Sequence, residues 1–155
     1  MKRDTALQPL SHQHHNSLMG CLLIRKGVEK KADKKVLKDF ILNWWQTDLQ
    51  KHMLAEEKVL LPYLSQHKFE KSFLNVIARD HDTIRLLADR LRVHEDGYRL
   101  YSIYADIVEQ HIRFEERVVF QKIQEKFTSQ ELATLEKQLP AENRKCMDYP
   151  VKFWE

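Results

Sequence analysis

Apolar residues recur at helical spacing through four long segments, and this periodicity constrains the fold more than any other feature of the sequence. Residues three and four positions apart share one face of a helix, so each segment predicts an amphipathic helix with one apolar face. Only three glycines and four prolines occur in 155 residues, which leaves few turn signals to connect many strands. The sequence therefore predicts an all-α protein.

Residues that start or stop helices divide the chain into these segments. Ser11 is expected to cap the first helix and Asp33 the second, because both side chains accept hydrogen bonds from free backbone N–H groups. Pro62 is expected to kink or end the second helix. Gly97 separates the third helix from the fourth. Residues 128–131 form a capping box, which predicts a short fifth helix.

Four long helices joined by short connections predict an up-down-up-down four-helix bundle. The bundle is expected over about residues 10–127, with the short extra helix and a tail over residues 128–155. The length suits one domain covering residues 1–155. Two aromatic residues near the C-terminus, Phe153 and Trp154, are expected to pack against the bundle.

Charge and cysteine content exclude several classes of protein. The net charge is +3, and the basic residues concentrate in residues 25–35 without the aromatic side chains that stack on bases, so this segment predicts a solvated connection rather than a nucleic-acid surface. No apolar run is long enough to cross a membrane or to form a signal peptide. Cys21 and Cys146 lack CxxC spacing, which favours reduced thiols and a cytoplasmic location.

Polar residues occupy the apolar face of every predicted long helix. Two of the four helices carry an HxxxE pair, in which both side chains share one face of the helix. Burying an unpaired charged group costs roughly several kcal/mol, so the side chains of a polar layer inside a bundle need hydrogen-bond, ionic or metal partners. Imidazole and carboxylate ligands suit iron, zinc or manganese, and the layer predicts a cage for two metal ions. Its candidate ligands are His15, His52, Glu56, His81, His111 and Glu115.

Other interpretations of these residues stay open. His14 lies beside His15 and is an alternative ligand from the first helix, and Glu116 is an alternative to Glu115. Glu57 and Glu116 are otherwise interpreted as supporting or surface groups. A metal-free network of His–Glu hydrogen bonds is a further alternative. HExxH, ExxH and a nucleophile elbow are all absent, so no catalytic residue is expected beyond the metal site.

These segments resemble the hemerythrin-like, or HHE cation-binding, family of di-iron four-helix bundles over roughly residues 10–125. The resemblance is carried by residues 15–23, 52–57, 80–84 and 111–116, which match the variant with an H…HxxxE…H…HxxxE ligand pattern. It implies two iron ions joined by an oxo or hydroxo bridge, with manganese or a mixed pair as alternatives. The resemblance assigns the terminal ligands to His15, His52, His81 and His111, and the bridging carboxylates to Glu56 and Glu115.

The chain departs from the oxygen-carrying members of that family at two positions. Ile77 stands where they have a fifth histidine, and Glu115 replaces an aspartate one residue further on. One protein ligand fewer leaves an open coordination position, which is typical of a reactive site. We therefore expect a protein that binds or reacts with hydrogen peroxide, dioxygen or nitric oxide. An oxidoreductase handling such oxidants and a sensor or iron-binding module acting through a protein partner both fit.

Overall fold

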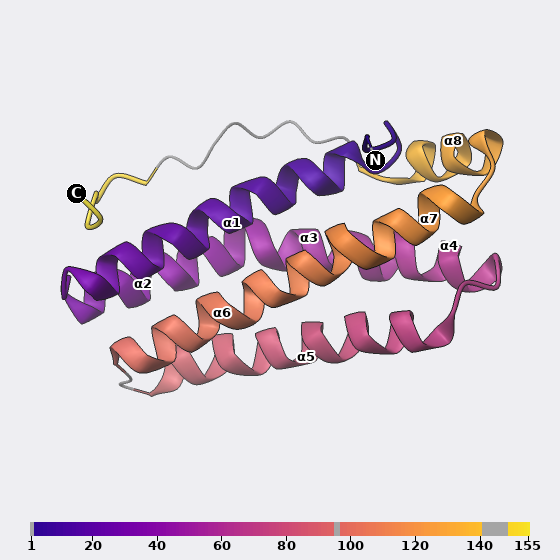
Figure 1. Cartoon of the computed structure of the whole chain (residues 1–155). Coiled ribbons are helices and arrows are strands. Elements are labelled where there is room, and N and C mark those ends of the chain that lie inside the picture. The colour runs from indigo at the N-terminus through magenta and orange to yellow at the C-terminus, as the bar shows by residue number, and fades with distance from the viewer. Residues whose placement is uncertain (1, 95–96, 141–148) are drawn as a thin grey trace.

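The computed structural model describes residues 2–94, 97–140 and 149–155, and within these ranges all regular structure is helical, which confirms the expected all-α fold. Four long helical stretches run the length of the molecule (Figure 1). Two of them contain π turns, labelled η. In chain order the elements are α1 (Gln8–Glu29), α2 (Lys34–Trp44), η1 (Trp45–Leu49), α3 (Gln50–Ala55), η2 (Glu56–Leu60), α4 (Leu61–Gln66), α5 (Lys71–Val93), α6 (Tyr98–Phe114), η3 (Glu115–Val119), α7 (Phe120–Lys126) and α8 (Ser129–Gln138).

The long stretches form the expected up-down-up-down bundle. Helix α1 packs against α2 and α6, and α5 packs against the same two helices, so each stretch has two antiparallel neighbours. Helix α8 lies at the end of the bundle that holds the N-terminus, whereas residues 149–155 lie at the opposite end (Figure 1).

Local sequence explains most of the helix ends. Asp33 caps α2 by accepting a 3.1 Å hydrogen bond from the N–H of Val36. Thr128 and Glu131 complete the capping box of α8, as expected. The expectation for Ser11 was wrong. Helix α1 already begins at Gln8, so the Ser11 hydroxyl lies within the helix and donates to a side chain of the fourth stretch.

Pro62 does not end the second stretch, because it lies in the first turn of α4, which continues to Gln66. The π turn η2 directly precedes it, and the N–H of Leu61 bonds the carbonyl of Glu56, five residues back. A π turn widens the backbone locally, which makes room for the proline ring.

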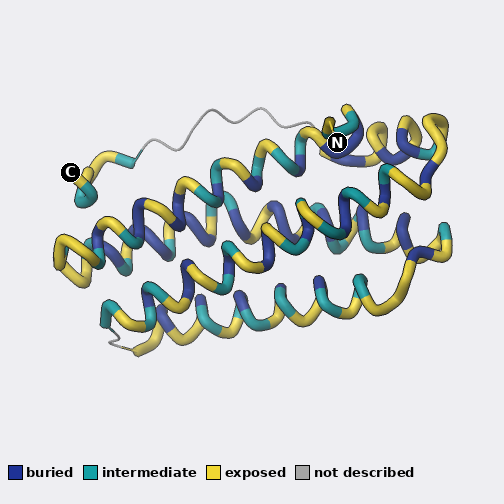
Figure 2. Tube along the Cα trace, in the orientation of Figure 1, coloured by how far each residue is buried: buried dark blue, intermediate teal, exposed yellow. Residues whose placement is uncertain are grey.

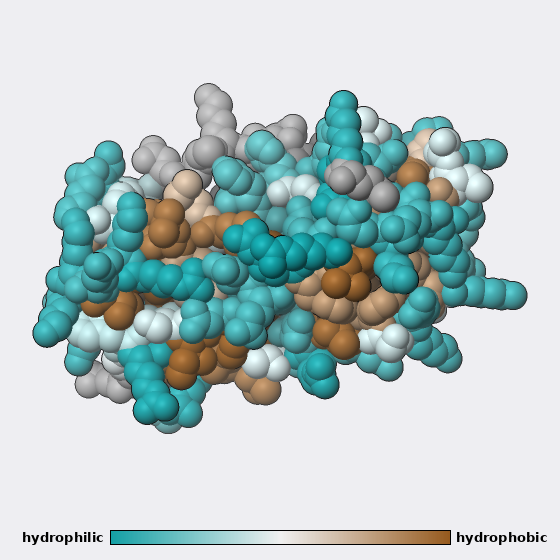
Figure 3. All heavy atoms as spheres, in the orientation of Figure 1, coloured by the Kyte–Doolittle hydropathy of each residue, from teal (hydrophilic) through white to brown (hydrophobic). Residues whose placement is uncertain are grey.

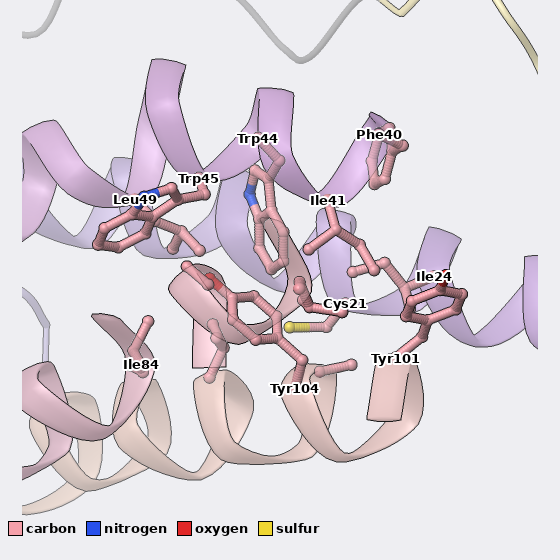
Figure 4. Packing of buried hydrophobic residues seen from close by; sticks show 14 of the residues in the cluster. Cys21, Ile24, Phe40, Ile41, Trp44, Trp45, Leu49, Ile84, Tyr101 and Tyr104 are labelled. Atoms are coloured by element: carbon pink, nitrogen blue, oxygen red, sulfur yellow. The ribbon is translucent and has the colours of Figure 1, made fainter. Parts of the chain in front are cut away.

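Buried residues form inward-facing rows on every long helix (Figure 2). The apolar core consists of two clusters. One includes Trp44, Tyr104 and Cys21, which interlock between the helices near the α1–α2 turn (Figure 4). The other surrounds Phe120 and Leu64 near α8. Six polar side chains occupy the space between the clusters.

The C-terminal aromatics pack as expected. The ring centroid of Phe153 lies 4.9 Å from that of Phe40, and that of Trp154 lies 6.4 Å from it. The lysines of residues 30–35 are exposed at the α1–α2 connection, which agrees with a solvated turn. The face in Figure 3 is mostly hydrophilic, with several small groups of apolar side chains between the hydrophilic ones. No helix in the described ranges is long and apolar enough to span a membrane.

Candidate metal centre

A layer of histidine and glutamate side chains crosses the middle of the bundle. Each of its members is at most 5% exposed, and every long stretch contributes at least one. The layer divides the two apolar clusters, because cluster residues precede and follow it along each of the four stretches. Its members are His14 on α1, His52 on α3, Glu56 in η2, His81 on α5, His111 on α6 and Glu115 in η3.

The six side chains form two overlapping groups of potential ligands. His14 and His52 form one group with both glutamates, and His81 and His111 form the other with the same two glutamates. Within each group, one ligand atom from every residue lies within 4.8 Å of the others. Sharing Glu56 and Glu115 between two histidine pairs is the arrangement expected of carboxylates that bridge two cations.

Distances in the first group are close to those between ligands of one metal ion. The Nε2 atom of His14 lies 3.0 Å from Oε2 of Glu115 and 3.0 Å from Nε2 of His52. The Nε2 atom of His52 lies 3.2 Å from Oε1 of Glu56. Two ligand atoms about 2.1 Å from a shared metal and at right angles are about 3.0 Å apart.

The second group has similar dimensions. The Nε2 atom of His81 lies 3.1 Å from Oε1 of Glu56, and that of His111 lies 2.7 Å from Oε1 of Glu115. The longer separation, 3.9 Å, joins Nε2 of His81 to Oε1 of Glu115. Both groups are therefore already near the spacing that a bound cation requires.

Several atoms of the layer have no hydrogen-bond partner among the described residues. They are Nδ1 of His14, Oε2 of Glu56, both carboxylate oxygens of Glu115 and Nε2 of His111. Although Nε2 of His111 is close to Glu115, the two groups do not meet in hydrogen-bonding geometry. Buried acceptors without donors are costly, and cations held by the two groups of side chains would satisfy them. The residues present therefore fit a pair of metal ions.

Three of the four histidines also make a contact through Nδ1 with a side chain outside the layer. Their Nδ1 atoms face Gln13, Glu57 and Asp80, at 2.5 Å from His52, 2.7 Å from His81 and 3.0 Å from His111 respectively. Such a contact fixes the ring and directs the lone pair of Nε2 inward, as is usual for metal-ligating histidines.

Charges within the layer perturb the titration of its members. Burial alone would lower the pKa of His14, but Glu115 and Glu116 outweigh burial and raise it to about 9. Burial likewise opposes the positive charge of His111, whose pKa Glu115 raises well above the usual value. For Glu115, burial favours the neutral form, yet the charge of His111 holds its pKa well below the ordinary range. Within the metal-free layer, His14, His111 and Glu115 thus favour one another's charged forms.

The two shared glutamates have the same local backbone. Glu56 is the first residue of the π turn η2, and Glu115 is the first residue of η3. A π turn inserts one residue into the helical repeat and is frequent at functional sites. Here each turn begins at the carboxylate of an HxxxE pair, so the widened backbone lies beside the polar layer.

The structure brings together five of the six residues expected from the sequence. The exception is His15, which is exposed, whereas His14 points into the layer. Glu115 lies in the layer, and Glu116 lies outside it, with its Oε2 atom 3.7 Å from Nδ1 of His14. Glu57 contacts His81, in agreement with a supporting role.

Sequence patterns did not reveal the contacts made by Gln13 and Asp80. Asp80 precedes His81 but faces His111 on the neighbouring helix. Gln13 likewise reaches His52 on another stretch. These contacts depend on how helices are rotated against one another, and no spacing within one helix encodes that rotation.

The geometry agrees with the result of a comparison with known families. The model of the hemerythrin HHE cation-binding domain matches residues 5–123, which include all six side chains of the layer. Neither the curated proteins nor the solved structures that were compared gave a significant match. The match spans most of the chain and contains a buried His–Glu layer suited to metal binding, and the chain belongs to the hemerythrin HHE cation-binding domain family.

Proposed function

We propose that this chain is a non-haem di-iron protein that binds or reacts with a small oxidant, of the class of hydrogen peroxide, dioxygen or nitric oxide. One observation carries the proposal: two pairs of histidine Nε2 atoms face the same two buried carboxylates. His14 and His52 would hold one ion, His81 and His111 the other, and both glutamates would bridge them. Two bound iron ions would supply redox chemistry and the coordination positions at which the oxidant binds.

The ligand count supports a reactive site. Each position offers two histidines and two shared carboxylates, which is fewer than the six donors of octahedral coordination. Ile77 lies one turn before His81 on α5, where the oxygen carriers of this family have an additional histidine, and its side chain is buried and apolar. The chain therefore leaves positions for exogenous ligands.

Burial supports a small substrate. The most exposed of the six side chains, His52, is only 5% exposed, and His111 is 4% exposed. A large substrate would have to separate the helices to reach the layer, whereas a diatomic molecule or peroxide requires little space. The surrounding apolar clusters also exclude water, which strengthens electrostatic interactions within the layer.

The test is metal content and reactivity of protein from iron-supplemented cells. Two irons per chain, ferric charge-transfer absorption that changes with peroxide, and steady consumption of peroxide would support an oxidant-handling enzyme. Two irons with spectral changes but negligible turnover would favour the alternative, a sensor or iron-binding module. A folded chain that binds neither iron nor manganese would overturn the proposal.

A further inference from the structure

We infer that the two metal positions are unequal: the His81–His111 position binds its ion first and tightly, and the His14–His52 position binds the second ion weakly and reversibly. This inference rests on the proposed metal function and concerns side chains outside the ligand layer. The two histidine pairs face the same carboxylates, so the difference between them comes from what holds each ring on its outer side.

Carboxylates hold both rings of the His81–His111 position. The Nδ1 atom of His81 lies 2.7 Å from Oε2 of Glu57, and that of His111 lies 3.0 Å from Oδ2 of Asp80. Arg85 fixes Glu57 by donating to both of its carboxylate oxygens. A carboxylate that accepts a hydrogen bond from Nδ1 fixes the tautomer and makes Nε2 a stronger donor to a metal.

The His14–His52 position lacks this support. His52 contacts the neutral side-chain amide of Gln13, which can orient the ring without adding negative charge. The Nδ1 atom of His14 has no hydrogen-bond partner among residues 2–94, 97–140 and 149–155. Its nearest carboxylate oxygen, Oε2 of Glu116, is 3.7 Å away and instead accepts a 2.8 Å hydrogen bond from Ser11.

The charge outside the two positions differs in the same direction. Two carboxylates and the guanidinium of Arg85 support the His81–His111 position, which gives a net charge of −1. One carboxylate, that of Glu116, and the guanidinium of Arg3, 3.3 Å from it, adjoin the His14–His52 position, which gives a net charge of zero. Hydrogen bonding and charge therefore both favour a cation at the His81–His111 position.

Unequal affinity has a consequence for function. The chain would hold one ion when iron is scarce and two when iron is abundant. Because the two-ion centre is completed only by the second ion, its reactivity with oxidants would depend on iron supply through the His14–His52 position.

The experiment is an anaerobic titration of the metal-free protein with Co²⁺ and with Fe²⁺. Calorimetry and competition with a chelator measure the binding. We expect two steps whose dissociation constants differ at least tenfold. His14→Ala should retain one ion at the wild-type affinity of the first step, whereas His111→Ala should lose that step. Helical circular dichroism and thermal unfolding of each metal-free variant establish that it is folded.

Two substitutions with opposite expected effects change the residues that contact the histidine Nδ1 atoms and leave the proposed metal ligands themselves intact. Asp80→Asn should weaken the first step by roughly 10- to 100-fold, the usual effect of losing an outer partner of a metal ligand. Gln13→Glu should tighten the second step and bring the two constants closer together. Equal affinities in the wild type, the reverse assignment, or no effect of Asp80→Asn would overturn the inference while leaving a two-metal site intact. Failure to bind either metal would instead overturn the proposed function.

Discussion

The Nε2 atom of His14 lies 3.0 Å from Oε2 of Glu115, which joins the first long helix to the last across the middle of the bundle. His15, the next residue in the chain, is exposed. His14→Ala should therefore bind one metal ion instead of two, whereas His15→Ala should bind both with wild-type affinity. Metal analysis after gel filtration measures this difference. Equal metal content in the two variants would contradict the assignment of His14.

The misplacement of His15 shows a limit of hydropathy patterns. Four apolar residues follow His15 at helical spacing, but two of them, Met19 and Leu22, are 42% and 45% exposed. The buried face of α1 instead includes Ser17 and Cys21, three and seven residues after His14, and Gly20 beside them. At Gly20 a larger side chain would collide with Trp44, so side-chain size as well as hydropathy limits the rotation of α1.

The other members of the layer were predictable because their own helices carry enough information. Each HxxxE pair lies in register with a strong apolar stripe, and burial of that stripe aims both side chains inward. The same holds for His81 on α5, where Ile77 and Ile84 are buried on the same face. What the sequence could not provide is the set of contacts between helices, such as that between Asp80 and His111.

Glu115 and Glu116 offer a second matched pair of substitutions. Glu115 belongs to both groups of potential ligands, so Glu115→Gln should weaken both positions and lower affinity for the second ion by at least about 100-fold. Glu116 is partly exposed and contacts Arg3 and Ser11, so Glu116→Gln should still bind two ions. Competition titrations with Co²⁺ measure both affinities. Retention of two tightly bound ions by Glu115→Gln would exclude its bridging role.

The stability of the metal-free protein should depend on pH through the same layer. The pKa of His14 is raised from 6.5 to about 9, so its stabilising contribution is complete below pH 6.5 and is lost as pH rises through 9. The pKa of Glu115 is lowered well below 4.5, so its contribution is present above pH 4.5 and is lost as pH falls through its folded-state pKa.

The free energy of unfolding of the metal-free protein should consequently be greatest between about pH 4.5 and 6.5 and should fall by an amount on the order of 1 to 3 kcal/mol toward pH 9. Metal ions displace the protons of the histidines, so apparent metal affinity should rise as the pH increases from about 6.5 to 9. Urea unfolding at a series of pH values measures the first effect. His14→Gln is the control, in which the alkaline loss of stability should be smaller.

Cys21 should be chemically inert in the folded protein. Burial raises the pKa of its thiol to about 12, and the side chain is fully buried beside Tyr104 and Trp44. The thiolate is the reactive form, so little of it exists at neutral pH. The chain has one other cysteine, Cys146, which lies outside the described residues. The variant Cys146→Ser leaves Cys21 as the single thiol. This variant should react with a thiol reagent only after denaturation. Rapid reaction under native conditions would show that the cluster around Cys21 opens readily.

Gly20 allows α1 and α2 to approach closely, and the substitution Gly20→Ala tests this packing by adding one methyl group. A Cβ atom at Gly20 would lie 2.6 Å from Cε2 of Trp44, which is too short for a non-bonded contact. Because Trp44 is fully buried, its indole has little freedom to move, and Gly20→Ala should lower the free energy of unfolding by about 1–3 kcal/mol.

Gly97→Ser is the matched control, because a Cβ atom at Gly97 would lie 3.8 Å from the nearest atoms of Lys34 and serine is well suited to the N-cap of α6. Its stability should remain within about 0.5 kcal/mol of the wild type in the same urea titration. Since Gly20 lies on the inner face of α1 six residues beyond His14, Gly20→Ala should also weaken metal binding if the clash rotates or displaces the helix. Unchanged stability of Gly20→Ala would mean that Trp44 can move aside, and that small residues on α1 do not set the position of His14.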